Sequence, residues 1–316
     1  MTASAKGTMI ETEQGFKVYR IRAAAGGAEA AIVPELGAIV SSLQLPGPDG
    51  LREVLFRHPH FWDPAAERTR GGIPFLFPVC GRLERNGQSG AYLFDGHVYE
   101  IKIHGFAMRG PWEVVKADAA SLTVRLTDSP ASLGQFPFPF RITLVFQFEG
   151  QAFVIDQVYE NTGTRPFPYY AGFHPYFLTP APGSGKEAVI LNYKPRSRWL
   201  PNERLTDIVG TAAAPAMPVS VTDPAVNEIL TQVGPEREVV LACPDGVSVH
   251  LRADGLEDPA MFPFVQLYTM ADRPFYCVEP WMGFPNALNA VSGVRWLAAG
   301  RTERGRLTVW TSTAAR

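Results

Sequence analysis

Residues 140–159 read FRITLVFQFEGQAFVIDQVY, the clearest structural signal in the chain. Over Phe140–Phe148, apolar side chains occupy every second position, a period of two that is typical of a β-strand with one buried face. Gly150 and Gln151 interrupt this pattern before a second strand-like segment, Ala152–Tyr159, begins. Two such segments joined by so short a turn predict an antiparallel hairpin.

Shorter segments of the same kind recur along the chain. Its 29 glycines and 28 prolines are spread throughout rather than gathered in a linker, which is typical of many strands joined by tight turns. We therefore expect one large antiparallel all-β domain over residues 1–316, with residues 1–14 as a poorly ordered tail. The other segments expected to be strands are Phe16–Arg22, Ala28–Val33, Ala38–Leu45, Ser121–Thr127, Val239–Cys243, Val247–Arg252 and Leu307–Thr311.

A helix and several loops are expected where the strand pattern breaks. Asp223 followed by Pro224 is typical of a helix start, with a capping residue before proline at the first helical position, and predicts a short helix toward Gly234. Loops on a rigid β-scaffold commonly carry binding and catalytic residues. The long loops are expected at residues 56–90, 178–220 and 280–305.

Composition narrows the classes of partner. With 46% hydrophobic residues the chain can bury a large core, and its net charge of −2, without a basic run, disfavours nucleic acid and anionic membranes. Residues 1–10 lack the apolar segment of a signal peptide, and no apolar run reaches membrane-spanning length. The cysteines at 80, 243 and 277 lack metal-site spacing, so we expect a reducing, cytoplasmic setting. We expect a small-molecule ligand and a monomer or homodimer.

Four blocks rich in glycine, proline and aromatic residues lie far apart in the sequence, and each carries an ionisable side chain. The blocks are Arg70–Leu83, His104–Trp112, Ala171–Phe177 and Phe275–Asn289, with Arg82, His104, His174 and Glu279 as their ionisable candidates. Each candidate alone has an ordinary interpretation. An arginine after a turn is commonly a surface residue, a histidine among aromatics can be a hydrogen-bonded core residue, and a buried carboxylate can be paired structurally.

Together the four side chains suit acid–base catalysis. A protonated imidazole at His174 can give a proton while the carboxylate of Glu279 takes one, and His104 and Arg82 can stabilise charge on oxygen. Motifs for a serine nucleophile, a phosphate loop, a dinucleotide or a Cys-x-x-Cys pair are absent from the sequence, so we expect no cofactor. His58-Pro59-His60 is a metal-binding pattern without a carboxylate at short spacing, and we expect packing there rather than a metal.

The ordered set of blocks resembles the aldose 1-epimerase (galactose mutarotase-like) family, from about Gly15 to Thr311. This resemblance implies a large antiparallel β-sandwich and a cofactor-free isomerase that interconverts the α and β anomers of a hexose. By motif position, Glu279 would be the general base and His174 the general acid, while Arg82, His104 and Trp281 would bind the sugar. The motifs are Gly-Gly-Ile-Pro to Gly-Arg at 71–82, His-Gly-Phe-Ala at 104–107, Gly-Phe-His-Pro-Tyr-Phe at 172–177, Glu-Pro-Trp at 279–281 and Ala-Leu-Asn at 287–289.

Departures from the family pattern leave the substrate open. Gly81 stands where the family has asparagine, and the nearest counterparts of its sugar-binding aspartate are Asp223 and Asn227. These departures also fit a sugar-binding protein without catalysis, whereas a glycosidase would need a second well-framed carboxylate. The first block also resembles the hexose-6-phosphate branch, in which charge-assisted bonds from arginines can hold a phosphate. The candidates for that role are Arg70, Arg85 and Arg109, beside Arg82.

Overall fold

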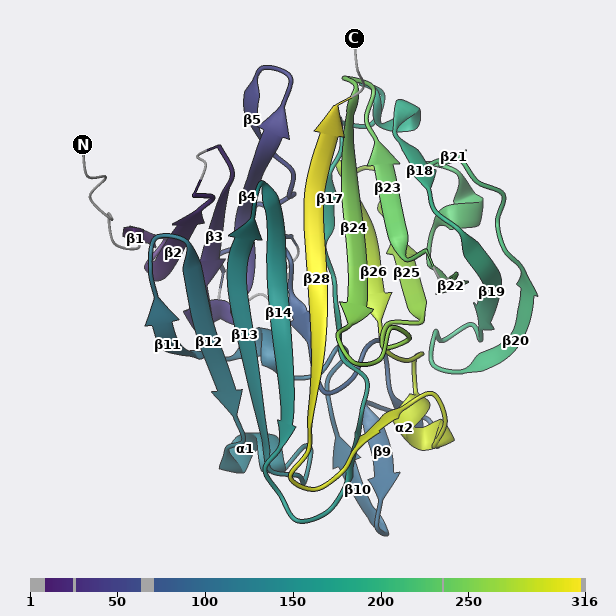
Figure 1. Ribbon diagram of the computed structural model, residues 1–316. Helices are drawn as coiled ribbons and strands as arrows, with labels where there is room; N and C mark the ends of the chain where they lie inside the picture. The colour runs from purple at the N-terminus through teal and green to yellow at the C-terminus, as the bar shows by residue number, and fades with distance from the viewer. Residues whose placement is uncertain (1–8, 25–26, 64–70, 235, 314–316) are drawn as a thin grey trace.

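Two layers of antiparallel β-strands pack face to face around a continuous apolar core (Figure 1). The computed structural model describes residues 9–24, 27–63, 71–234 and 236–313. The layer nearer the viewer in Figure 1 is a nine-stranded sheet. In spatial order its strands are β11 (Glu113–Ala117), β12 (Ser121–Thr127), β13 (Phe140–Glu149), β14 (Ala152–Asn161), β28 (Thr302–Thr313), β24 (Val247–Gly255), β23 (Glu238–Ala242), β18 (Ile190–Asn192) and β21 (Val219–Ser220).

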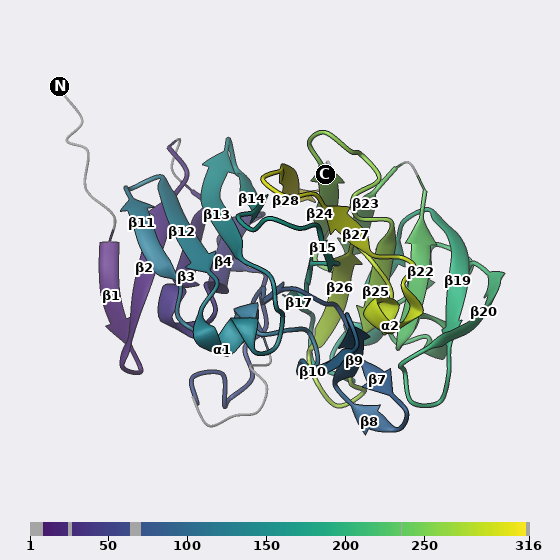
Figure 2. The same cartoon turned by 90° about the horizontal axis from the view of Figure 1, so that it is seen from below.

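The second layer combines an eight-stranded and a five-stranded sheet, which lie side by side in Figure 2. Isolated bridges from Val40 to Ile73 and from Leu55 to Phe177 connect them. The eight-stranded sheet runs β20 (Ile208–Ala213), β19 (Pro195–Pro201), β22 (Ile229–Val233), β25 (Phe264–Tyr268), β26 (Phe275–Trp281), β16 (Gly172–Phe173) and β6 (Phe75–Leu76), with β17 (Tyr176–Leu178) also paired to β26. The five-stranded sheet runs β1 (Met9–Glu13), β2 (Phe16–Arg22), β3 (Glu29–Val33), β4 (Ile39–Gly47) and β5 (Gly50–Glu53).

Short elements complete the fold. The two-stranded pairs are β7 (Glu84–Arg85) with β8 (Gln88–Ser89), β9 (Ala91–Phe94) with β10 (His97–Glu100), and β15 (Phe167–Tyr169) with β27 (Arg295–Leu297). The helices are α1 (Pro130–Leu133), α2 (Ala287–Ala290) and the 3₁₀ turns Pro34–Leu36, Ala107–Arg109, Lys186–Ala188 and Pro224–Val226. None of the helices in the described ranges has the length and apolar composition of a membrane-spanning segment.

The hairpin expected from the opening stretch is confirmed, and it lies within the nine-stranded sheet. β13 and β14 pair in register from Phe140 opposite Asn161 to Glu149 opposite Ala152. The apolar side chains of β13 at positions 140, 142, 144 and 146 are at most 1% exposed and belong to the core between the layers. The other expected strands also form, with differences at their ends. The fold is therefore the antiparallel β-sandwich that the sequence predicts.

The prediction of a helix from Asp223 toward Gly234 is correct for the first turn and wrong beyond it. The side chain of Asp223 caps the turn as predicted, accepting a hydrogen bond from the amide of Ala225 at 2.8 Å, but the turn ends at Val226. Ile229–Val233 then forms β22, a strand between β19 and β25. Pairing on both edges overrides the local helix signal, because strand preference depends mainly on neighbouring strands and burial.

Two further expectations change at the ends and loops of the sheets. Met9–Glu13 is strand β1 rather than part of a poorly ordered tail, because a tight turn at Gln14 and Gly15, both with left-handed φ, pairs it with β2. Residues 1–8 lie outside the described ranges. The segments expected as long loops contain short strands, among them β19 and β20 within 178–220 and β27 within 280–305.

Candidate active site

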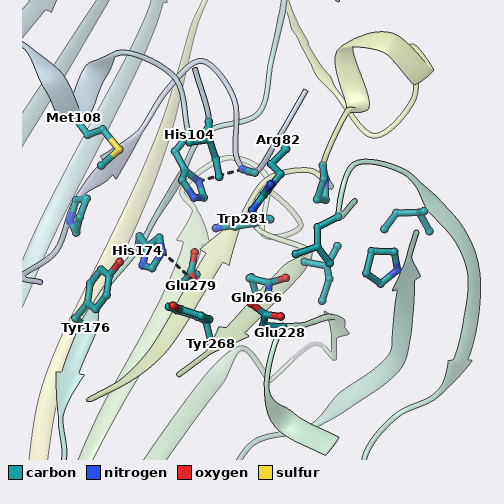
Figure 3. A pocket seen from close by; sticks show the side chains of 18 of the residues that line it. Arg82, His104, Met108, His174, Tyr176, Glu228, Gln266, Tyr268, Glu279 and Trp281 are labelled. Carbon is teal, nitrogen blue, oxygen red and sulfur yellow. Dashed lines mark hydrogen bonds and ion pairs between the residues drawn. The ribbon is translucent and has the colours of Figure 1, made fainter. Parts of the chain in front are cut away.

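A cavity of about 180 Å³ opens on the eight-stranded sheet, and Figure 3 shows side chains that line it. Side chains alternate along β25 and β26, so Leu267 and Val278 join the core between the layers while Gln266 and Glu279 point into the cavity. All four sequence blocks reach this cavity. Among the predicted site residues, those that line it are Arg82, His104, Arg109, His174, Glu279 and Trp281.

Glu279 lies at the floor of the cavity and is 1% exposed. Its position on β26, opposite Gln266 of β25, holds the carboxylate on a central strand. No group in the described ranges makes a hydrogen bond of good geometry to Oε2. Burial raises the pKa of the Glu279 carboxyl well above its usual range, and the nearby Trp281 indole only partly opposes this shift. A carboxyl of this kind is a stronger proton acceptor than one in water.

His174 faces Glu279, with Nε2 of the ring 3.3 Å from Oε1 of the carboxylate (Figure 3). Its backbone follows β16 and is held by a hydrogen bond from its amide to the carbonyl oxygen of Pro74, at 3.0 Å. The imidazole stacks on the ring of Tyr176 with centroids 4.5 Å apart and an interplanar angle of 6°. The strand end and the stacked ring together fix the orientation in which the imidazole meets the carboxylate.

His104 has a defined tautomer when its ring is neutral. The amide of Gly81 donates a hydrogen bond to Nδ1 at 3.1 Å, so Nδ1 is unprotonated and the proton lies on Nε2. The residue has a left-handed φ of 64°, and its own amide donates to the carbonyl oxygen of Gly81 at 3.0 Å. These two bonds tie the first block to the second and place the proton of the neutral ring on Nε2.

Arg82 and Trp281 form further walls of the cavity. Arg82 is exposed and, within the described residues, has no ion pair or hydrogen bond on its guanidinium, so its donors are available to a ligand. The ring of Trp281 is buried and packs edge-on against His104, with centroids 5.8 Å apart. The site thus combines a buried carboxylate, two imidazoles, a cation and an aromatic wall.

The order and geometry of these groups agree with a known family. A sequence profile described as aldose 1-epimerase matches residues 19–308. This chain belongs to the aldose 1-epimerase family.

Three similar proteins have low sequence identity to this chain, and the two of them with solved structures share its fold. The chromosomal protein LacX of Lactococcus lactis subsp. lactis is 23% identical over 265 residues, which are 76% of this chain and 81% of LacX. The Slr1438 protein of Synechocystis sp. PCC 6803 is 26% identical with a TM-score of 0.80, over 94% of this chain and 96% of its own. A galactose mutarotase related enzyme from Lactobacillus acidophilus is 21% identical with a TM-score of 0.78, over 94% and 97% of the two chains.

Of the described arginines expected to bind a phosphate, Arg82 and Arg109 line the cavity and Arg85 does not. Arg109 lines the cavity, but its guanidinium donates to the carbonyl oxygens of Gly105 and Ile103, at 3.2 and 2.9 Å, and so holds the loop that carries His104. Arg85 lies on β7 and does not line the cavity. Arg70 falls outside the described residues. His58 and His60 also lie away from the cavity and belong to no three-ligand group in the described ranges.

Of the neighbours Asn227 and Glu228, only Glu228 lines the cavity. Asn227 does not line the cavity, and its side-chain oxygen accepts a hydrogen bond from the amide of Thr269 at 2.8 Å. Glu228 lines the cavity instead, and its own backbone has a left-handed φ of 52°. Asn227 therefore holds the backbone of this region, and Glu228 presents the carboxylate.

Sequence reasoning also missed Gln266 and Tyr268, which line the cavity from β25. The alternation of Phe264–Tyr268 could have indicated a strand with two polar positions on one face. The position of Gln266 opposite Glu279 depends on the register between β25 and β26, which no local pattern encodes.

Proposed function

We propose that this member of the aldose 1-epimerase family is an active mutarotase for free hexoses. The observation that carries the proposal is the 3.3 Å approach of His174 Nε2 to Glu279 Oε1 at the floor of a small cavity. A buried carboxylate with a raised pKa next to an imidazole is suited to move protons near neutral pH. A protein that only binds sugar has no need of such a matched pair.

Ring opening requires two proton transfers. The carboxylate of Glu279 accepts the proton of the anomeric hydroxyl, and the imidazolium of His174 gives a proton to the ring oxygen as its bond to C1 breaks. The products are an open-chain aldehyde, a protonated Glu279 and a neutral His174. Rotation about the C1–C2 bond turns the other face of the aldehyde toward the hydroxyl. Ring closure then reverses both transfers and restores the starting proton count.

The remaining groups stabilise charge and orient the sugar. The Nε2–H of His104 and the guanidinium of Arg82 can donate to oxygens on which negative charge develops. Glu228 and Gln266 can pair with ring hydroxyls, and Trp281 offers an apolar wall. No covalent bond to the protein is needed, in keeping with the lack of a nucleophile motif in the sequence.

Free hexoses are favoured over hexose phosphates because of how the arginines are used. A phosphate is best held by several guanidinium donors. Of the described arginines near the cavity, Arg109 is committed to backbone carbonyls and only Arg82 presents its donors. We therefore expect turnover of free sugar without a phosphate.

Polarimetry with fresh α-glucose and α-galactose tests this proposal. Faster relaxation of optical rotation on either sugar, in proportion to protein concentration, is the expected result. Glucose 6-phosphate is tested in parallel with an anomer-specific coupled assay. Acceleration of this sugar alone would retain the chemistry but contradict the choice of substrate. Sugar binding without acceleration would contradict catalysis.

A further inference from the structure

Cys277 is a buried thiol beside the catalytic pair that the proton transfers do not use. It lies two residues before Glu279 on β26, so both side chains are on the same face of the strand. The thiol sulfur, a carboxylate oxygen of Glu279 and a ring nitrogen of His174 all lie within 4.8 Å of one another. All three residues are buried. In the part of the chain that the structure describes, this is the one group of three such ligands.

The donor set is suited to a thiophilic divalent cation. Zinc binds thiolate, imidazole and carboxylate, at about 2.3 Å from sulfur and about 2.0–2.2 Å from nitrogen or oxygen. Three atoms no further than 4.8 Å apart enclose a point within about 2.8 Å of each, so shifts of about 0.5–0.8 Å reach bonding distance. Magnesium prefers oxygen ligands and octahedral geometry, so this site does not suit it.

Charge and hydrogen bonding point to a ligand at the same place. Oε2 of Glu279 is buried and has no hydrogen bond of good geometry within the described residues, which leaves a carboxylate lone pair unused. When metal binding displaces the thiol proton, the thiolate and the carboxylate carry two negative charges in an apolar setting, and a divalent cation neutralises both. Packing is the ordinary role for a buried cysteine, and Cys277 does belong to a small apolar cluster with Phe56, Tyr176 and Phe275. Packing alone leaves Oε2 of Glu279 without a hydrogen bond of good geometry in the described residues.

We propose that His174, Cys277 and Glu279 form an inhibitory binding site for a thiophilic divalent cation such as Zn²⁺. Binding displaces the thiol proton of Cys277 into solvent and occupies the lone pairs with which Glu279 and His174 act on the sugar. The bound ion thus switches off proton transfer. Metal binding itself does not depend on the proposed function, whereas its inhibitory effect rests on it.

Direct titration tests the site without reference to activity. Chelator-treated protein is titrated with ZnCl₂ by calorimetry, and with CoCl₂ by the absorption of the cobalt–thiolate bond, with MgCl₂ as the negative control. We expect one equivalent of zinc and of cobalt, and no magnesium. Cys277→Ala should weaken zinc binding at least a hundredfold, whereas Cys243→Ala, which removes a buried thiol elsewhere on the chain, should leave it unchanged. Should Cys277→Ala fail to fold, Cys277→Ser takes its place, because a hydroxyl is a poor ligand for a soft metal.

The outcomes separate this proposal from the function proposed above. Zinc binding that is unchanged in Cys277→Ala, or the absence of binding to the wild-type protein, would overturn the metal site. Stoichiometric zinc binding by a protein without mutarotase activity would retain the site and overturn the function. If both hold, zinc should inhibit the wild-type enzyme, EDTA should reverse the inhibition, and Cys277→Ala should keep its activity in zinc.

Discussion

Gly105 of the second block lies against Phe77 of the first block, and a single methyl group there should disable the site. An ideal Cβ on Gly105 would lie 1.9 Å from the carbonyl oxygen of Phe77, and the backbone φ is 80°. Gly87, in the hairpin between β7 and β8, has nearly the same φ of 82° with nothing within 4 Å of an added Cβ. The two positions therefore separate the cost of the left-handed backbone from the cost of the overlap.

The expected cost follows from these two contributions. An alanine in the left-handed region costs about 1–2 kcal/mol, and this applies to both variants. Forcing extra atoms into a packed site typically costs about 1–3 kcal/mol more, which applies only to Gly105→Ala. We expect Gly87→Ala to lose about 1–2 kcal/mol of unfolding free energy, and Gly105→Ala to lose about 2–5 kcal/mol.

Urea denaturation and mutarotation kinetics measure the two effects. The midpoint of unfolding should fall further for Gly105→Ala than for Gly87→Ala at a similar m-value. Activity should fall only for Gly105→Ala, because the loop that must move also carries His104. Equal midpoints for the two variants would refute the claim that close contact with Phe77, rather than backbone conformation alone, requires glycine at position 105.

The remaining predictions concern the ionisable groups and the cavity wall. The pKa of Glu279 is raised, and the base must be ionised to accept a proton. The acid limb of the pH profile of kcat/KM should therefore lie above the ordinary glutamate pKa of about 4.3. An acid limb at or below that value would contradict the burial argument. The folded state also holds the Glu279 proton more tightly than the unfolded state, so the stability of wild type relative to Glu279→Gln should fall as pH rises from about 4.3 through the raised pKa, as measured by denaturation across pH. Glu228→Ala should raise KM about tenfold or more with a smaller change in kcat, since a hydrogen bond to a charged group contributes about 1.5–3 kcal/mol; an unchanged KM would remove Glu228 from the sugar site. Asn227→Ala should instead cost about 1–3 kcal/mol of stability, because it leaves the amide of Thr269 unpaired, and a midpoint equal to wild type would contradict that role.

The sequence predicts those parts of the molecule whose structure is locally determined. Alternation over residues 140–148 fixes which face of β13 is buried, and glycine and proline frames identify the blocks that carry His104 and Glu279. Pairing between distant strands is not locally encoded, so the position of Gln266 opposite Glu279 could not be predicted. For the same reason Ile229–Val233 became a strand, despite a correctly identified cap at Asp223.

Side-chain direction is the other feature that the sequence leaves open. Arg109 lies in a predicted site block, yet its guanidinium binds the carbonyl oxygens of its own loop. Asn227 and Glu228 are adjacent in the chain, and the left-handed φ of Glu228 helps to decide which of the two reaches the cavity. A carboxylate at the cavity wall is thus found only once the backbone is known.

The turnover of Glu279→Gln tests the central claim most directly. Glutamine keeps the size of the side chain and cannot accept the anomeric proton, and a general base typically contributes about 10²–10⁴-fold to rate. On a hexose that the wild-type protein turns over, we predict that kcat falls at least a hundredfold while the protein stays folded, and that Glu257→Gln, the same change at an exposed carboxylate, keeps full activity. Full turnover by Glu279→Gln would contradict the account.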